Sequence, residues 1–231
     1  MNAIVLVDFF NLRLYNHGQS PNLAIIRSGV EELVTTVLSS QPNVHSFCFR
    51  FYGSWDSSKP IHVEVFRILS AVIHNHPKRH GSVRLMFEFS HNILVDHRIK
   101  VINTNKYRPA HRLSLNVHRG PCIINNCPIR LLTDWSNGSC PDSACSTPLS
   151  AVATVNTQKI IDCLLTVDAI TVITESLYDG IIIASDDLDF VPLYAYALAK
   201  AFPIHQLFRH NELSPDYLAP LRQRGLTTQQ W

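Results

Sequence analysis

A short apolar run that ends in a group of acids constrains the fold of this chain more than any other feature. Residues 181–183 are three isoleucines in a row, a β-branched run typical of a strand buried on both faces of a parallel sheet. Three carboxylates follow within four residues, at Asp186, Asp187 and Asp189, before a helix-like segment begins. We therefore expect these acids on a strand-to-helix turn, at the sheet edge where open α/β folds bind ligands.

Two interpretations of the acidic turn remain open from its own residues. Clustered carboxylates repel one another and lose hydration together, so their proximity is unfavourable unless a cation compensates for it. The alternative is a helix start that uses Asp as a cap and complements the helix dipole. A second buried-strand candidate, residues 3–7, also ends on an acid, Asp8.

Strand-like and helix-like segments alternate along most of the chain, which predicts βαβ units and a parallel sheet covered by helices on both sides. The expected strands are residues 3–7, 44–52, 83–89, 181–184 and, as the last strand, 204–208. The expected helices are residues 21–39, 60–75, 158–175, 191–201 and a short terminal helix from Ser214. The predicted fold class is thus α/β, with three α/β/α layers around a mostly parallel sheet.

The alternation stops between about residues 91 and 150, which we interpret as an insertion into a single domain spanning residues 1–231. This stretch is polar and interrupted by Pro, Asn and Gly, with strand-like pieces at 113–117 and 129–132. Four of the six cysteines lie within 24 residues here: Cys122, Cys127, Cys140 and Cys145. Two pairs of thiolates on turns suit a structural zinc ion, with unligated thiols or a disulfide as alternatives. Cys48 and Cys163, outside the insertion, are expected to be small core residues.

A basic stretch precedes these cysteines and is a candidate surface for nucleic acid. Its candidate substrate-binding residues are Arg98, Lys100, Lys106, Tyr107, Arg108 and Arg112, with further positive charge at Lys78, Arg79, His80 and Arg84. Such cations can contact phosphates and Tyr107 can stack on a base, which suits RNA. The alternative for each residue is a solvated charged loop, and the net charge of +2 does not by itself indicate a nucleic-acid binder. The insertion is also a candidate surface for a protein partner.

The helix expected over residues 158–175 carries two further acids. At about 100° per residue, Asp168 falls in the middle of the apolar stripe and Asp162 at its edge, nearer the helix start. A carboxylate buried in such a stripe must be paired, protonated or bound to a cation. A surface acid or a buried salt bridge is the alternative for either residue. Considering both acids together with Asp8 and Asp187 favours a cation site over that alternative.

These pieces, in this order, resemble the NYN domains of the PIN-like nuclease superfamily over about residues 3–90 and 156–221. The family pattern begins with a strand that ends in Asp-x-x-Asn, matched by Asp8 and Asn11. An acidic helix of the type Lys-Gly-Val-Asp, with a second Asp further along, is similar to residues 159–168. The last motifs are Tyr-Asp before a strand, matched by residues 178–179, and Ser-Gly-Asp-x-Asp-Phe-x-Pro-Leu after it, matched by residues 185–193.

Three positions depart from the family pattern. Phe9, Ile160 and Asp186 stand where the family usually has glycine, changes expected to narrow the pocket or alter the number of bound ions without removing an acid. The resemblance implies a parallel sheet between helical layers. It also implies divalent-metal-dependent cleavage of RNA that leaves 5′-phosphate and 3′-hydroxyl ends.

A Mg²⁺ or Mn²⁺ ion fits this chemistry, because it takes oxygen ligands, lowers the pKa of a bound water and stabilises charge on a phosphodiester. The predicted ligands are Asp8, Asp162, Asp168 and Asp187. Asn11 and Ser185 are expected to bond a phosphate or a metal-bound water. Asp189 is expected to orient the attacking water or to support the metal ligands without touching the ion, Lys159 to bind substrate, and Asp186 to be a turn residue. An endoribonuclease is the main hypothesis; its alternatives are an RNA-binding or scaffold protein without turnover and a nuclease acting on DNA.

The expected compartment is the cytoplasm. No run approaches the roughly 18 uncharged apolar residues of a membrane helix, and the first residues lack the basic region of a signal peptide. Cytoplasmic thiols stay reduced, which favours metal ligation over disulfides for the clustered cysteines.

Overall fold

A seven-stranded sheet runs through the part of the chain that this computed structural model describes, residues 1–12, 20–53, 55, 60–95, 159–210 and 215–231. In sheet order the strands are β3 (Arg79–His80), β4 (Val83–Phe89), β2 (Ser46–Tyr52), β1 (Asn2–Asp8), β5 (Gly180–Ala184), β6 (Ile204–Phe208) and β7 (Thr227–Gln230). Every neighbouring pair is parallel except β3 and β4, which are antiparallel. The predicted α/β class with a mostly parallel sheet is confirmed.

Strand β1 lies at the centre of the sheet, between β2 and β5. From β1 the chain moves outward through β2 to β4, and it later returns to place β5 on the other side of β1, followed by β6 and β7. The order of the strands therefore reverses between β1 and β5. In open α/β sheets such a reversal separates the connections on the two faces and creates a crevice at the carboxyl ends of the strands.

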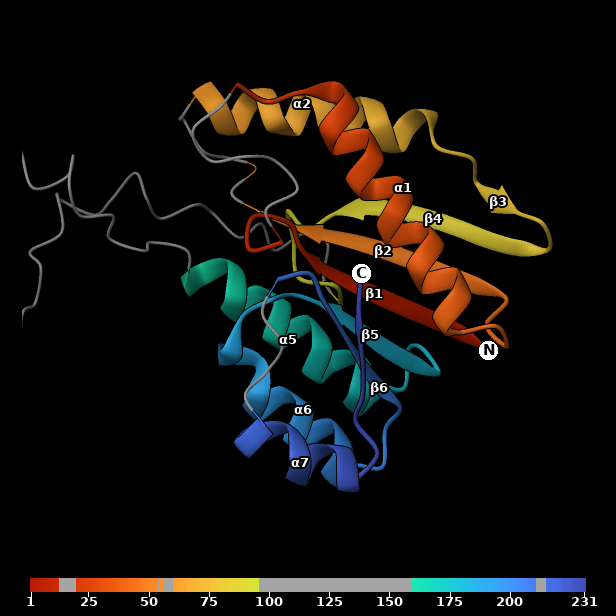
Figure 1. Ribbon diagram of the computed structural model, residues 1–231, viewed down its shortest axis with the longest axis vertical. Helices are drawn as coiled ribbons and strands as arrows, with labels where there is room; N and C mark the ends of the chain where they lie inside the picture. The colour runs from red at the N-terminus through yellow and green to blue at the C-terminus, as the bar shows by residue number, and fades with distance from the viewer. Residues whose placement is uncertain (13–19, 54, 56–59, 96–158, 211–214) are drawn as a thin grey trace, which may run out of the picture. The chain divides into compact units, whose positions relative to one another are not determined.

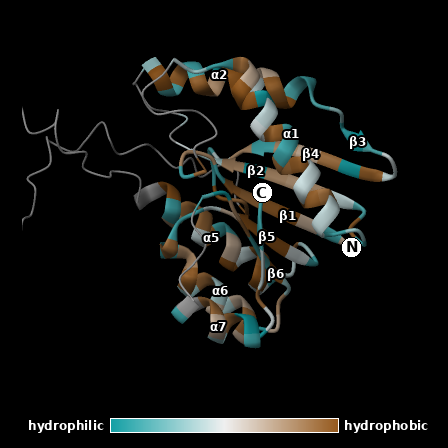
Figure 2. Cartoon of the chain, viewed as in Figure 1, coloured by the Kyte–Doolittle hydropathy of each residue, from teal (hydrophilic) through white to brown (hydrophobic). Residues whose placement is uncertain are grey.

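Helices cover both faces of the sheet (Figure 1). Helices α1 (Leu23–Ser40) and α2 (Pro60–Asn75) pack on one face, and α5 (Lys159–Glu175), α6 (Val191–Ala199) and α7 (Pro215–Gln223) on the other. Alternate side chains of β1 serve the two cores: Val5 and Val7 face α1 and α2, whereas Ile4 and Leu6 face α5 and α6. The central strands are accordingly hydrophobic along their length (Figure 2). None of the described helices has the length and apolar character that crossing a membrane requires.

Local signals explain where the elements begin and end. Helix α1 begins at Leu23, two residues after the predicted start, because the Asn22 side chain accepts hydrogen bonds from the backbone N–H groups of Ala24 (2.8 Å) and Ile25 (3.4 Å). Helix α6 ends two residues before the predicted boundary, and Ala201 beyond it has a positive φ of 52°. The bounds predicted for α2, β4 and β6 agree with the structure.

Strand β6 is not the last strand, which corrects one prediction. Strand β7 follows it and pairs with it in parallel, yet its sequence, Thr-Thr-Gln-Gln, has no apolar residue that would mark a strand. The two-residue strand β3 was also missed. The strand-like pieces at 113–117 and 129–132 lie outside the described residues, so the predicted insertion stays a prediction. All described elements belong to one unit, built from residues 1–103 and 158–231.

The two cysteines that the structure describes differ in environment. Cys48 on β2 is buried, as predicted. Cys163 is exposed, so its prediction as a core residue is wrong. Its neighbours explain the difference, because Leu164 and Leu165, one and two residues along α5, are the side chains that turn towards the sheet.

Candidate metal centre

Three aspartates from distant parts of the chain meet at the carboxyl ends of β1 and β5. Val7 of β1 pairs with Ala184 of β5, so Asp8 at the end of β1 and the turn carrying Asp187 lie at the same edge of the sheet. The first turn of α5 adds Asp162. One carboxylate oxygen from each of these three residues lies within 4.8 Å of the others. The three acids could therefore hold a metal ion, and their predicted convergence is confirmed.

Hydrogen bonds fix the Asp8 carboxylate, which is 2% exposed. The Ser185 hydroxyl donates to Asp8 Oδ2 at 2.8 Å, and Asn11 Nδ2 donates to the same oxygen at 2.6 Å. Asn11 Nδ2 also lies 3.2 Å from Asp187 Oδ2. Asn11 thus links two of the three acids, which supports its predicted place in the site.

Burial dominates the ionisation of Asp8. Burial is the largest cause that raises the pKa of Asp8 to about 6, and the charge of Asp187 adds to the increase. The hydrogen bonds from Ser185 and Asn11 oppose this increase but do not cancel it. Near neutral pH this carboxyl group therefore gains from either a proton or a cation, and a set of carboxylate oxygens is the donor set that hard divalent ions prefer.

The acidic turn serves as a helix cap and as part of the site at the same time. Asp187 precedes the short 3₁₀ helix η2 (Leu188–Phe190), where its Oδ1 accepts a hydrogen bond from the Asp189 backbone N–H at 2.9 Å. Its Oδ2 faces Asn11. The cap and the cation site, which the sequence left as alternatives, are therefore compatible because they use different oxygens. Asp189 is exposed, and its expected action on a water stays a prediction.

Ser185 and Asp186 have structural tasks in this turn. Ser185 is fully buried; its hydroxyl donates to Asp8 and accepts from the Asp187 backbone N–H at 3.1 Å. It therefore orients the two acids, and its predicted bond to a phosphate or a metal-bound water stays a prediction. The Asp186 carboxylate accepts hydrogen bonds from the backbone N–H groups of Arg209 (2.6 Å) and His210 (3.2 Å), which confirms Asp186 as a turn residue.

Asp168 does not belong to the ligand set, which corrects the sequence-based prediction. It is fully buried in the apolar stripe of α5, as predicted, but its oxygens are occupied by protein donors. Its Oδ2 accepts from Arg50 Nε at 3.0 Å and from Tyr52 Oη at 2.8 Å, and its Oδ1 accepts from the Leu94 backbone N–H at 2.8 Å. A carboxylate with a buried guanidinium partner and three donors has its charge compensated without a metal.

The Arg50 side chain extends this network across the sheet. Arg50 is 2% exposed, and its Nη1 lies 2.8 Å from Glu88 Oε1 on the neighbouring strand β4. Its Nη2 donates to the carbonyl oxygen of Asn92, just after β4. The network therefore fastens β2, β4 and α5 together beside the acidic crevice. An Arg inside the apolar run of β2 was the sequence signal for a buried acidic partner, and it was missed.

Part of the predicted basic surface lies at the edge of the sheet opposite the aspartates, and not beside them as predicted. Arg79, His80 and Arg84 belong to β3 and to the start of β4, which is the edge opposite the aspartates because β4 runs parallel to β2 and β1. Lys78 Nζ donates to the Ile73 carbonyl oxygen at 2.7 Å. The remaining predicted residues lie outside the described part: the Lys159 side chain, Arg98, Lys100, Lys106, Tyr107, Arg108, Arg112 and the cysteines 122, 127, 140 and 145.

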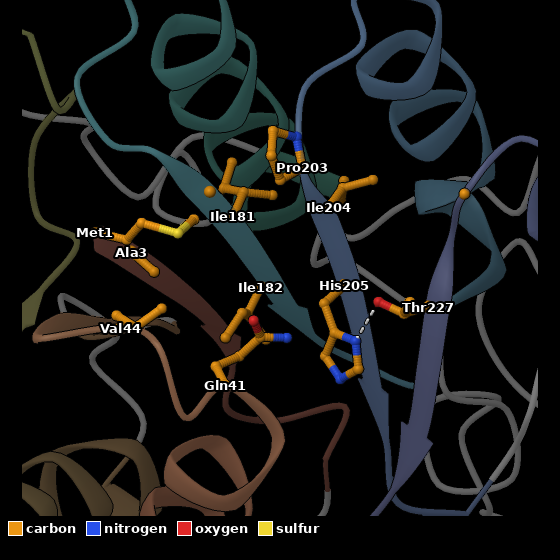
Figure 3. Close-up of a pocket in the computed structure, with 12 residues that line it drawn as sticks. Met1, Ala3, Gln41, Val44, Ile181, Ile182, Pro203, Ile204, His205 and Thr227 are labelled. Carbon is orange, nitrogen blue, oxygen red and sulfur yellow. Dashed lines mark hydrogen bonds between the residues drawn. The ribbon is translucent and has the colours of Figure 1, made fainter.

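A cavity of about 250 Å³ opens at the amino ends of β1, β5 and β6, away from the aspartates (Figure 3). His205 lies in it with Nδ1 2.6 Å from Thr227 Oγ1, and burial lowers the pKa of His205 to about 4, so this ring is neutral at pH 7. Its described lining holds no Asp, Glu, Lys or Arg side chain. The cavity therefore lacks the charged groups of a metal or phosphate site, and the acidic crevice is the stronger candidate.

No family model, curated protein or solved structure matches this chain. The likeness to NYN domains therefore depends on the sequence motifs, and the candidate metal centre depends on its own geometry.

Proposed function

We propose that this protein is a divalent-metal-dependent endoribonuclease that uses Mg²⁺ or Mn²⁺. The observation that carries the proposal is the convergence of Asp8, Asp162 and Asp187, with one oxygen of each within 4.8 Å of the others, at the crevice between β1 and β5. This is the place in the fold where a ligand is expected. The sequence motifs around the same three acids supply the choice of RNA as the substrate.

Each described residue of the crevice has a definable task in phosphodiester hydrolysis. When bound, a divalent ion would supply a more acidic water and positive charge beside the phosphate. Asp8, Asp162 and Asp187 would hold that ion, while Asn11 and Ser185 keep the carboxylates of Asp8 and Asp187 in place. Attack of a water oxygen on phosphorus would break the P–O3′ bond, and O3′ would gain the equivalent of the proton that the water loses. The products would be the 5′-phosphate and 3′-hydroxyl ends implied by the resemblance.

Two departures from the family pattern leave the crevice unchanged. Phe9 is fully buried in the core that faces α1 and α2, where its ring lies 5.7 Å from that of Trp55. Asp186 turns its carboxylate to the backbone after β6. Both side chains make their described contacts away from the three aspartates, and all three acids are retained, so we favour turnover over a purely RNA-binding role.

Cleavage of a single-stranded RNA oligonucleotide in Mn²⁺ or Mg²⁺ tests the proposal. We expect Asp187→Asn to abolish cleavage, because it removes a ligand charge while Asn can still cap η2. Asp179→Asn is the matched control: Asp179 precedes the same strand, β5, but it is exposed at the opposite edge, where it accepts from the Asn2 backbone N–H at 2.7 Å. Full activity of Asp187→Asn would contradict the proposal, and cleavage of a matched DNA oligonucleotide instead of RNA would correct the substrate.

A further inference from the structure

Tyr194 carries a buried polar atom that the fold leaves without a partner. The residue lies near the start of α6, is fully buried, and packs in the core cluster that also contains Phe190 and Leu193. Its Oη has no hydrogen-bond partner among the described residues. Buried hydroxyl groups are almost always bonded, so one without a protein partner beside a candidate site is available to a bound ligand.

The surroundings of this hydroxyl indicate where its partner would be. Helix α6 begins directly after the turn that holds Asp187. Tyr194 belongs to the same core cluster as Leu6, and Asp8, two residues after Leu6 at the end of β1, lies on that same face of the sheet. Burial raises the pKa of the Tyr194 phenol, and the negative charges of Asp8 and Asp187 add to the increase. The phenol therefore keeps its proton at neutral pH and can donate a hydrogen bond on the face of the sheet that carries Asp8.

The donors already present explain why Tyr194 differs from its neighbours. Asn11 and Ser185 donate to Asp8 at 2.6 and 2.8 Å, so hydrogen bonds within the protein set their positions. The Tyr194 hydroxyl bonds to none of the described residues. It is therefore a donor on the same face as Asp8 that can serve a bound ligand.

We propose that Tyr194 is a positioning residue of the metal centre: its hydroxyl donates a hydrogen bond to the oxygen atoms that surround a divalent cation held by Asp8, Asp162 and Asp187. This inference rests on the proposed function of the acidic crevice. The bond stabilises negative charge on those oxygens and fixes their direction. It contributes to metal affinity and not to the stability of the metal-free protein.

Tyr194→Phe tests the inference, because it removes one oxygen atom and keeps the ring. In the metal-free protein we expect the thermal midpoint to stay the same or rise, since an unpartnered buried hydroxyl is removed. Mn²⁺ affinity, measured by calorimetry or by electron paramagnetic resonance of free Mn²⁺, should fall roughly threefold to tenfold, the range of one hydrogen bond. Tyr196→Phe is the matched control. That side chain is partly exposed on the same helix with Lys200 Nζ 5.8 Å from its ring centre, and we expect unchanged affinity.

The outcomes separate this inference from the proposal on which it rests. If the wild-type protein binds Mn²⁺ and Tyr194→Phe binds it with the same affinity, the inference about Tyr194 is overturned, but the proposed metal centre is not. A clear fall in the midpoint of metal-free Tyr194→Phe would also overturn it, because the hydroxyl would already have a partner in the fold. No Mn²⁺ binding by the wild-type protein would overturn the metal centre itself and this inference with it.

Discussion

The Asp8 carboxylate illustrates, at the scale of a single residue, why the crevice favours a cation. The sheet buries it, and Asp187 places a second negative charge beside it, so that its pKa rises to about 6 in spite of two good hydrogen bonds. A carboxyl group with a raised pKa binds a proton more tightly in the folded state than in the unfolded state. It therefore contributes stability at low pH that is lost as the pH rises from about 4 through about 6.

Metal binding should consequently compete with this proton. We expect Mn²⁺ affinity to strengthen as the pH rises through about 6, because Asp8 must be ionised to act as a ligand. Below that pH the apparent Kd should weaken by about tenfold per pH unit, as one released proton requires. Calorimetric titrations at pH 5, 6 and 7 measure this dependence. An affinity that is constant across this range would show that Asp8 is not a ligand.

Helix α5 shows, at the scale of an element, how two acids on one helix acquire different roles. Asp162 in the first turn lies with Asp8 and Asp187, whereas Asp168 is buried between α5 and the sheet, where it accepts hydrogen bonds from Arg50 and Tyr52. Six residues at about 100° each place these two side chains on different sides of the helix. The period-2 pattern of β2 brings both Arg50 and Tyr52 to the face that α5 covers.

Asp168→Asn should be strongly destabilising, because it leaves the Arg50 guanidinium buried and without its charged partner. We expect a loss of about 3–5 kcal/mol in the free energy of unfolding, measured by urea titration. Glu88→Gln is the control: Glu88 is 35% exposed and also pairs with Arg50, so its loss should be about 1 kcal/mol or less. Mn²⁺ affinity of folded Asp168→Asn should match the wild type. A neutral Asp168→Asn with weakened metal binding would restore Asp168 to the ligand set.

The same elements show which features the sequence could predict. The apolar runs of β1 and β5 and the acids that end them were enough to place the crevice, because parallel strands share an edge. The burial of Asp168 followed from helical spacing, but its partner did not, since Arg50 lies 118 residues away in the chain and periodicity carries no information across that separation. Strand β7 was not predicted because its Thr and Gln side chains give no apolar pattern. It forms through backbone pairing with β6, which the sequence does not show.

The metal centre unites, at the scale of the whole molecule, two segments that are distant in sequence. Asp8 comes from the segment before the predicted insertion, and Asp162 and Asp187 come from the segment after it. Both segments belong to one unit of residues 1–103 and 158–231. The centre therefore forms only when the chain has returned to place β5 beside β1. The predicted insertion between these two segments is expected to be stabilised separately, because it holds the four clustered cysteines.

The clustered cysteines should supply that stability through one zinc ion per chain. We expect protein purified without chelators to contain about one equivalent of zinc by elemental analysis, and Cys127→Ser with Cys145→Ser to lose it, because a structural zinc site needs all four ligands. Cys163→Ser is the control, since Cys163 is exposed on α5 and separate from the four cysteines in sequence. Zinc-free protein with four freely titratable thiols in the insertion would contradict the prediction.

Anomalous diffraction from a crystal soaked in Mn²⁺ tests the central claim most directly, because it locates the ion without requiring the substrate. The account predicts a manganese peak about 2.0–2.3 Å from oxygens of Asp8, Asp162 and Asp187, with Asp168 still bonded to Arg50. A crystal in which manganese occupies other sites but is absent from these three carboxylates would contradict the account.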